Sequence, residues 1–232
     1  MKNLWIKGLS GFALAFVAQA ALAVPVVITS TATTGPKILA TSQIVVTPTP
    51  NVLALFNSAR VNGHLISAFT AENGATTSIG YGTVAFSGLT YFRTISFNAP
   101  VASMTYESTN LTVLEQTVQG SIRITSEQSP SQIFIRGGEL TIKDMRIDHS
   151  TKTVYATVIG ANGVGTRQNV PFWTYAAATG HTTFPGGNIQ ATLSPIRLTT
   201  DGLSAWVQSL GLTQDGRNVL TSTNNSTTGF GN

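Results

Sequence analysis

The sequence predicts an all-β protein, an antiparallel β-sandwich or barrel-like sheet of about ten strands with one short C-terminal helix. Three observations lead to this prediction. Short runs in which apolar and polar residues alternate recur along most of the chain, as half-buried strands require. Turn-forming pairs such as Asn73-Gly74 separate several of these runs. Only the segment "TTDGLSAWVQSLGL" has an unambiguous helical spacing of apolar residues.

Residues 1–23 are predicted to be an export signal. Lys2 and Lys7 give a positive start, an apolar stretch follows, and Ala21-Leu22-Ala23 is a small-x-small cleavage pattern. The apolar stretch is shorter than the ~20 residues that span a bilayer. We therefore expect a secreted chain that begins at Val24 and is located outside the cell or at its surface, with the periplasm as the alternative.

The composition excludes several classes of protein. The chain has no cysteine, so neither a disulfide framework nor a lipid-modified cysteine is expected. Loss of Lys2 and Lys7 with the signal reduces the 13 basic residues to 11, against 9 acidic ones. No Lys/Arg run supports nucleic acid or an anionic membrane surface as a partner. No hydrophobic segment with a basic end follows, so no membrane span is expected after signal cleavage. Only 9% of residues are charged; such surfaces suit proteins that assemble or adhere, and an ordinary exported protein with a Thr-rich face is the alternative.

Residues 24–50 are predicted to form an extended N-terminal arm or the first strands. The runs "VPVVITS" and "KILATSQIVV" are β-branched and nearly uncharged, and Pro48 and Pro50 follow them. Such a strand pairs either with the sheet of its own chain or with the open sheet edge of a neighbouring copy. The predicted assembly strand has its apolar side chains at Val24, Val26, Ile28, Ile38, Ile44 and Val46.

Residues 51–220 are predicted to form the β-domain. The segment "NVLALFNSARV" is ambiguous, because one face fits a helix but Asn62-Gly63 leaves room for barely two turns. Runs rich in aromatic and β-branched residues follow, and each predicts a strand. In order they are "IGYGTVAF", "LTYFRTISF", "VASMTYES", "LTVLEQTV", "SIRITSE" and "SQIFIRGG".

The stretch "RGGELTIKDMRIDHSTKTVYATV" predicts a hairpin with a β-bulge. Leu140 and Ile142 share one face of a strand, but Met145 and Ile147 resume the apolar pattern one residue out of phase. An extra residue near Lys143-Asp144 restores all four side chains to one face. The letters "DHSTK" then predict the turn, and the alternating "TVYATVIG" predicts the returning strand.

The same stretch contains the densest cluster of charge in the chain. Asp144 and Asp148 are close enough to bind Ca²⁺ or to act on a glycosidic bond. Lys143, Arg146 and Lys152 are close enough to neutralise them. We interpret the cluster as ion pairs on the solvated face of the sheet.

The C-terminal helix is predicted by both its apolar stripe and its ends. Thr200 or Asp201 is the expected N-cap, and Gly211 is the expected stop. Its apolar stripe consists of Leu203, Trp206, Val207 and Leu210. Residues 221–232 are polar and glycine-rich and are predicted to be a flexible tail, with a last edge strand as the alternative.

Signatures of catalysis and of metal binding are few. The three histidines are far apart in sequence, and no pair has metal-ligand spacing. No G-x-S-x-G elbow occurs, and the glycines of "GANGVGT" fit a hairpin turn better than a phosphate loop. We therefore predict no catalytic residues, no metal and no cofactor.

The aromatic residues suggest a ligand site as the second hypothesis. Trp173, Tyr175 and His181 lie near Gly180 and Gly186-Gly187, where backbone can approach a flat ligand closely. If exposed, these rings would stack on haem or on a sugar. The alternative is that the rings pack in the core.

The C-terminal half, from about Glu139, resembles a pattern in secreted bacterial β-proteins. The residues that carry the resemblance are "LTIKDMRIDHSTKTVYATVIGANG", "VPFWTY" and "NIQATLSPIRLTTDGLSAW". It is similar to exported proteins of the exosortase-sorted type and, more loosely, to HtaA-like haem-binding domains. The Pro-Glu-Pro sorting signal of the first group is absent. The resemblance implies a secreted β-fold.

The sequence leads to two functional hypotheses, with the preferred one given first. The first is a non-enzymatic structural protein that self-assembles, or adheres to other surface components, at the bacterial cell surface. The second is an extracellular module that binds haem or carbohydrate.

Overall fold

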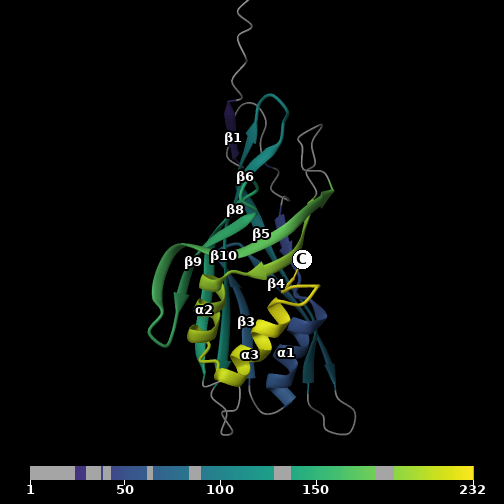
Figure 1. Ribbon diagram of the computed structural model, residues 1–232, viewed down its shortest axis with the longest axis vertical. Coiled ribbons are helices and arrows are strands. Elements are labelled where there is room, and N and C mark those ends of the chain that lie inside the picture. The colour runs from purple at the N-terminus through teal and green to yellow at the C-terminus, as the bar shows by residue number, and fades with distance from the viewer. Residues whose placement is uncertain are drawn as a thin grey trace, which may run out of the picture.

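A computed structural model describes residues 24–29, 38, 43–61, 65–83, 90–127, 137–180 and 191–231 (Figure 1). The predicted signal (1–23), the Asn62-Gly63 pair, His64 and His181 lie outside the described residues.

The described chain is dominated by an open antiparallel sheet of eleven strands, which confirms the predicted all-β class with a short C-terminal helix. Several strands pair with their neighbours in sequence, as antiparallel pairing permits. The main path through the sheet runs β1-β5-β6-β8-β9-β10-β11, while β2 and β4 pair with β5, and β7 joins β3 to β8. The strands are β1 (Pro25–Thr29), β2 (Gln43–Val46), β3 (Leu65–Glu72), β4 (Thr76–Thr83), β5 (Thr90–Glu107), β6 (Val113–Val118), β7 (Ser121–Glu127), β8 (Gly138–Asp148), β9 (Thr153–Gly160), β10 (Gly165–Gly180) and β11 (Ala191–Leu198).

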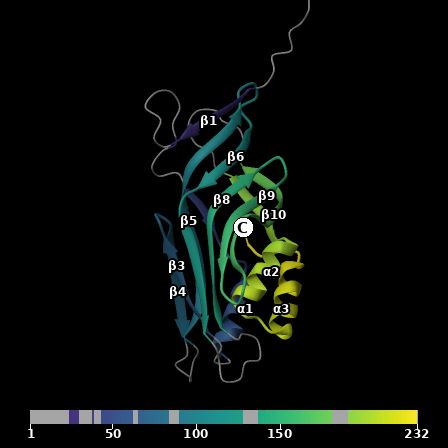
Figure 2. The same cartoon turned by 90° about the vertical axis from the view of Figure 1, so that its left-hand side faces the viewer.

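Strand β5 is 18 residues long and connects two parts of the molecule. Its first half pairs with β4 and β2, and its second half pairs with β1 and β6. Pro100 lies between the segments that pair with β4 and with β6, and pairing with β6 shifts register between Val101 and Ser103. Figures 1 and 2 show that β1, the end of β5 and β6 project from one end of the molecule, away from the helices. We call β1, residues 101–107 and β6 the arm, and the rest the body.

Three helices lie together on the body: α1 (Pro50–Val61), α2 (Thr200–Ser209) and α3 (Gln214–Asn224). The ambiguous segment 51–61 is therefore helical. Helix α2 is the predicted C-terminal helix. Its N-cap is Thr199, one residue before the predicted position, and the Thr199 hydroxyl accepts a hydrogen bond from the Gly202 amide. Gly211 has a positive φ of 64° after the helix, as predicted for the stop.

The prediction of a flexible polar tail at 221–232 is corrected by the structure. Residues 221–224 complete α3, and Asn224 is buried. Phe230 packs edge-on against Trp206 with ring centroids 5.0 Å apart. One buried ring and one buried amide anchor a segment whose composition is otherwise polar, so the folded region extends beyond the predicted limit at residue 220.

The hairpin of β8 and β9 has the predicted bulge. Pairing shifts register between Lys143 and Arg146, and Asp144 has a φ of 51°. Leu140, Ile142, Met145 and Ile147 are all buried, so the extra residue returns the apolar side chains to one face.

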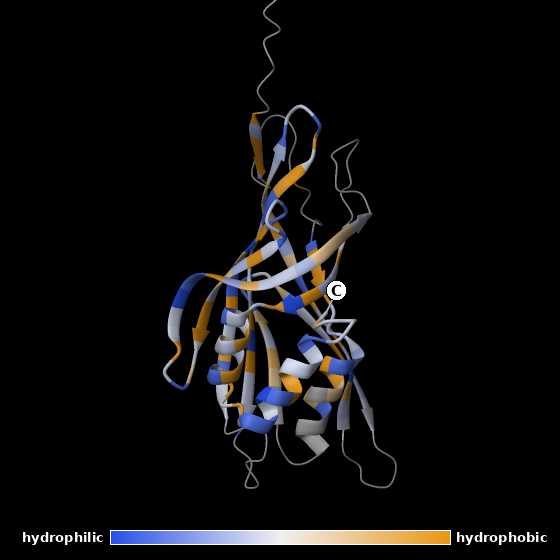
Figure 3. Cartoon of the chain, in the orientation of Figure 1, coloured by the Kyte–Doolittle hydropathy of each residue, from blue (hydrophilic) through white to orange (hydrophobic). Residues whose placement is uncertain are grey.

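Buried apolar side chains form two separate clusters. The large one fills the body between the sheet and the helices. The small one lies in the arm, and Figure 3 shows apolar segments on β1 and β6 at that end. The arm cluster consists of Ile28, Ile38, Val101, Met104, Tyr106 and Val113.

Candidate assembly site

The predicted assembly strand lies on β5 of its own chain. In β1, Val26 is opposite Tyr106 and Ile28 is opposite Met104. In β2, Ile44 is opposite Ala99 and Val46 is opposite Phe97. Both strands run antiparallel to β5, with β1 beside residues 103–107 and β2 beside residues 97–100. Of the two pairings left open by the sequence, this chain adopts the one with its own sheet.

The N-terminal segment supplies part of the arm's own core. Ile28 and Ile38 are 4% and 6% exposed and cover Met104, Tyr106 and Val101. Val26 and Ile44 pack against the same cluster from its margin. Without residues 24–46, the apolar side chains of β5 and β6 in the arm would face water.

The opposite face of the same segment is exposed and apolar. The exposed fractions are 59% for Val24, 63% for Val27 and 47% for Val45. These are three of the seven large apolar side chains found exposed in the described residues. Within the described part of the chain, β1 pairs with β5 and with no other strand. A strand edge flanked by exposed valines is a site where a further chain can add.

Side chains from the helices close edges of the body. In α1, the Asn57 amide donates to the Phe92 carbonyl at 2.7 Å, and its Oδ1 accepts from the Phe92 amide at 2.6 Å. This pair of hydrogen bonds takes the place of a neighbouring strand at that residue of β5.

A second asparagine closes β11 in the same way. Asn224 in α3 accepts from the Leu198 amide at 2.6 Å and donates to the Leu198 carbonyl at 3.0 Å. Next to it, Gly231 forms bridges to both Ile196 and Pro48. Asparagine side chains thus occupy body edges at two places, and at the end of β1 the Ile38 amide donates to the Thr29 carbonyl at 3.3 Å.

A chain of polar side chains connects the body to the arm. The Tyr175 hydroxyl in β10 and Nδ1 of His149, in the turn after β8, are 2.8 Å apart. The Nε2 of His149 is 3.1 Å from Oε1 of Gln116 in β6. The Gln116 amide in turn donates to Sδ of Met104 at 3.9 Å. The last member of this chain belongs to the arm cluster.

Burial and hydrogen bonds shift the pKa values of the titratable side chains at this point of the molecule. It lowers the pKa of His149 from its ordinary value of 6.5, and the negative charge of Asp148 only partly opposes the shift. Burial, with a contribution from Asp148, raises the pKa of Tyr175 to about 12. Hydrogen bonds from Ser150 and Thr151 outweigh burial and lower the pKa of Asp148. Both His149 and Tyr175 are therefore neutral at pH 7.

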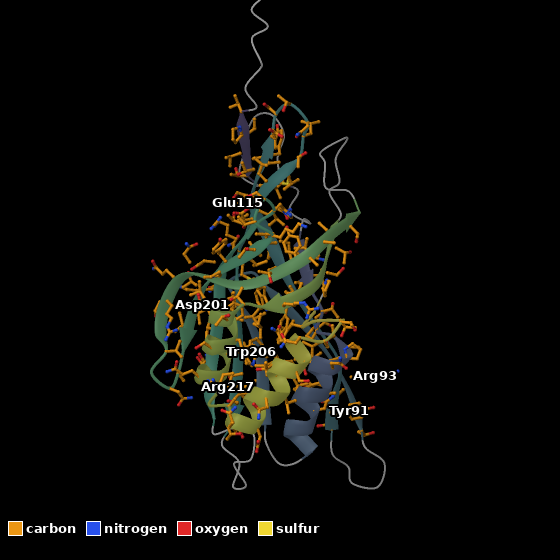
Figure 4. All side chains as sticks on the ribbon, viewed as in Figure 1. Tyr91, Arg93, Glu115, Asp201, Trp206 and Arg217 are labelled. Carbon is orange, nitrogen blue, oxygen red and sulfur yellow. The ribbon has the colours of Figure 1, made fainter. Side chains whose placement is uncertain are left out.

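The charged cluster consists of partly exposed ion pairs, as interpreted from the sequence. Arg146 contacts Glu115 at 2.8 Å and Asp148 at 4.0 Å. The Arg146 guanidinium also lies 4.3 Å from the ring centroid of Tyr155. Figure 4 shows Glu115 towards the arm and Trp206 among the helices. These pairs join β6 to β8 at the base of the arm, which is a structural role.

Two of the three predicted ligand residues pack in the core. Trp173 and Tyr175 are 6% and 5% exposed, so of the two alternatives left open by the sequence these rings adopt core packing. Trp173 instead stands edge-on to Phe172, with ring centroids 4.5 Å apart, and its Nε1 is buried without a hydrogen-bond partner. His181 lies outside the described residues.

Among the residues that the structure describes, no three His, Asp or Glu side chains gather in an arrangement that holds a metal ion. No helix of that part of the chain is both long and apolar enough to cross a membrane.

Comparison with known proteins returned no match to a family model, to a curated protein or to a solved structure. The resemblance to exosortase-sorted and HtaA-like proteins therefore stays a prediction.

Proposed function

We propose that this protein is a secreted, non-enzymatic structural subunit that self-assembles or adheres at the bacterial cell surface. In this proposal, residues 24–46 leave β5 of their own chain, both in the arm and at residues 97–100 beside it, and cover the same residues of a neighbouring copy. The single observation that carries the proposal is the separate arm cluster, of which the N-terminal segment supplies a part.

The separation of the two clusters allows the arm to open while the body stays folded. Ile28 and Ile38 belong to the arm cluster alone, whereas Ile44 and Val46 of β2 also pack against the margin of the body cluster. Burying one such side chain contributes roughly 1.5–3 kcal/mol. A partner copy that brings an identical segment restores these contacts, so exchange between copies changes no native interaction inside the arm.

The head-to-tail direction of this exchange favours open polymers. The segment that is given and the arm that receives it are different surfaces, so the contact is heterologous and continues from copy to copy. A charged fraction of 9% keeps repulsion between copies low. Asn57 and Asn224 close edges of the body, which leaves the arm as the favoured place for strand addition.

Electron microscopy and light scattering of the exported protein test the proposal. Deletion of residues 24–47 should abolish polymers and leave a folded, soluble monomer. If the intact protein never polymerises and the deletion unfolds the body, the proposal is wrong.

Two neighbouring residues of β1 provide a matched pair of variants. Ile28→Asp places a charge in the arm cluster and should prevent polymers, because Ile28 is buried. Val27→Asp changes a side chain that is 63% exposed and should leave the strand contact intact. Equal loss of polymers in both variants would show that the buried face of β1 is not what joins the copies.

A further inference from the structure

The polar chain from Tyr175 to Met104 crosses from the body to the arm. Tyr175 lies in β10, His149 in the turn after β8, and Gln116 and Met104 in arm strands β6 and β5. The backbone amide of His149 also donates to the Leu114 carbonyl of β6 at 2.9 Å. His149 thus contacts the arm through both its backbone and its side chain.

The hydrogen bonds of this chain assign the proton on His149. The Gln116 amide nitrogen donates to Met104, so the Gln116 oxygen is an acceptor and Nε2 of His149 carries the hydrogen. Nδ1 is then the lone-pair nitrogen and accepts from the Tyr175 hydroxyl. Each donor in this arrangement has one acceptor.

A second proton on His149 disrupts this arrangement of donors and acceptors. Nδ1 would become a donor facing the Tyr175 hydroxyl, which has only one hydrogen and lies on a residue that is 5% exposed. Either the hydroxyl turns away and loses its acceptor, or the imidazolium moves towards water and releases Gln116. Both outcomes are costly in a buried site.

We infer that His149 makes closure of the arm, meaning the packing of the N-terminal segment on β5 and β6, dependent on pH. Acid then loosens the N-terminal segment and favours its exchange between copies. The exchange step rests on the proposed function; the loosening of the arm within one copy does not.

The pH range over which the arm loosens depends on the groups around His149. Asp148 is adjacent to it, and Tyr175 stays protonated. Glu115 and Arg146 pair with each other at the base of the arm, and Lys152 donates to the Ala176 carbonyl. Burial lowers the pKa of His149 from 6.5, and a histidine that opening of the arm exposes to water regains that ordinary value. Closure is therefore at full strength above pH 6.5 and weakens as the pH falls towards the lowered value. The lowered pKa of Asp148 adds its effect only below about 3.8.

The NMR signals of methionine methyl groups measure the loosening of the arm directly in the monomer. Besides Met1 in the predicted signal, the chain has only Met104 in the arm cluster and Met145 in the body cluster. We expect the NMR signal of the Met104 methyl group to change with a midpoint below pH 6.5, while that of Met145 stays constant. Each pH unit within the range should raise the open fraction by up to about tenfold.

Variants separate His149 from other causes. His149→Gln should remove the transition, whereas the double variant His64→Gln/His181→Gln should keep it. Tyr175→Phe keeps the ring but removes the hydroxyl that stabilises neutral His149, so the midpoint should rise.

A Met104 signal that is constant from pH 8 to pH 4 in the folded protein would overturn the inference, as would an unchanged transition in His149→Gln. Because the methyl signals are read in the monomer, absence of polymers would contradict the proposed function and leave this result standing.

Discussion

Replacing Ile28 with alanine should open the arm and leave the body intact. Ile28 is 4% exposed and belongs to a cluster of six buried residues. Buried isoleucine-to-alanine changes cost about 2–5 kcal/mol, and the low end applies to a small cluster that can relax. A cost of about 2–3 kcal/mol raises the open fraction of the arm by roughly 30- to 140-fold.

Hydrogen–deuterium exchange of β1 and of residues 101–107 measures this open fraction, because exchange follows the population of open states. Tryptophan fluorescence during urea unfolding measures the body, since Trp173 and Trp206 both lie in the body cluster. Leu140→Ala is the matched control, because Leu140 is fully buried in that cluster. Ile28→Ala should speed exchange in the arm with little change in the fluorescence midpoint, and Leu140→Ala should lower the midpoint. A midpoint lowered equally by both changes would refute the separation of arm and body.

Three further changes test individual contacts, each by urea unfolding followed through tryptophan fluorescence. Gly202→Ala places a Cβ 2.2 Å from the Phe172 carbonyl oxygen and should destabilise the body by about 1–3 kcal/mol; an unchanged midpoint would contradict the close approach of α2 to β10. Asp144→Gly relieves a φ of 51° and should stabilise the hairpin by up to about 1 kcal/mol, whereas a loss of stability would mean that the Asp144 side chain matters more than its backbone. Asn224→Ala leaves the Leu198 amide and carbonyl unpaired and should cost about 2–3 kcal/mol; a neutral result would show that water replaces the amide.

Local patterns predicted much of the sheet. Alternation along "LTIKDMRID", with its one-residue phase slip, was sufficient to place the bulge at Lys143-Asp144, because a bulge is the local way to keep four apolar side chains on one face. The stripe containing Trp206 and the following Gly211 was likewise sufficient for α2. These features depend on residues that are near one another in sequence.

Features that depend on distant residues were missed. Asn224 is one polar residue in a polar segment, and its buried role follows only from its position beside Leu198 in another element. The sequence gives no signal that places Tyr175 beside His149, 26 residues earlier, or Asn57 beside Phe92. Exposure and core packing of Trp173 both stayed open, because strand alternation cannot show that a helix packs against β10.

Segment exchange between copies is tested most directly by disulfide formation between two different single-cysteine variants. The chain has no cysteine of its own, and Val27 lies directly opposite Thr105. Directly opposite residues of antiparallel strands have Cα atoms ~4.5–5.5 Å apart, within the range of a disulfide. Val27→Cys and Thr105→Cys proteins, mixed under assembling conditions and oxidised, should yield a covalent pair that joins these two positions. Val27→Cys mixed with Thr94→Cys, an exposed position of β5 that pairs with Gly80, should not. Polymers that form without any cross-link between positions 27 and 105 would contradict exchange of the N-terminal segment.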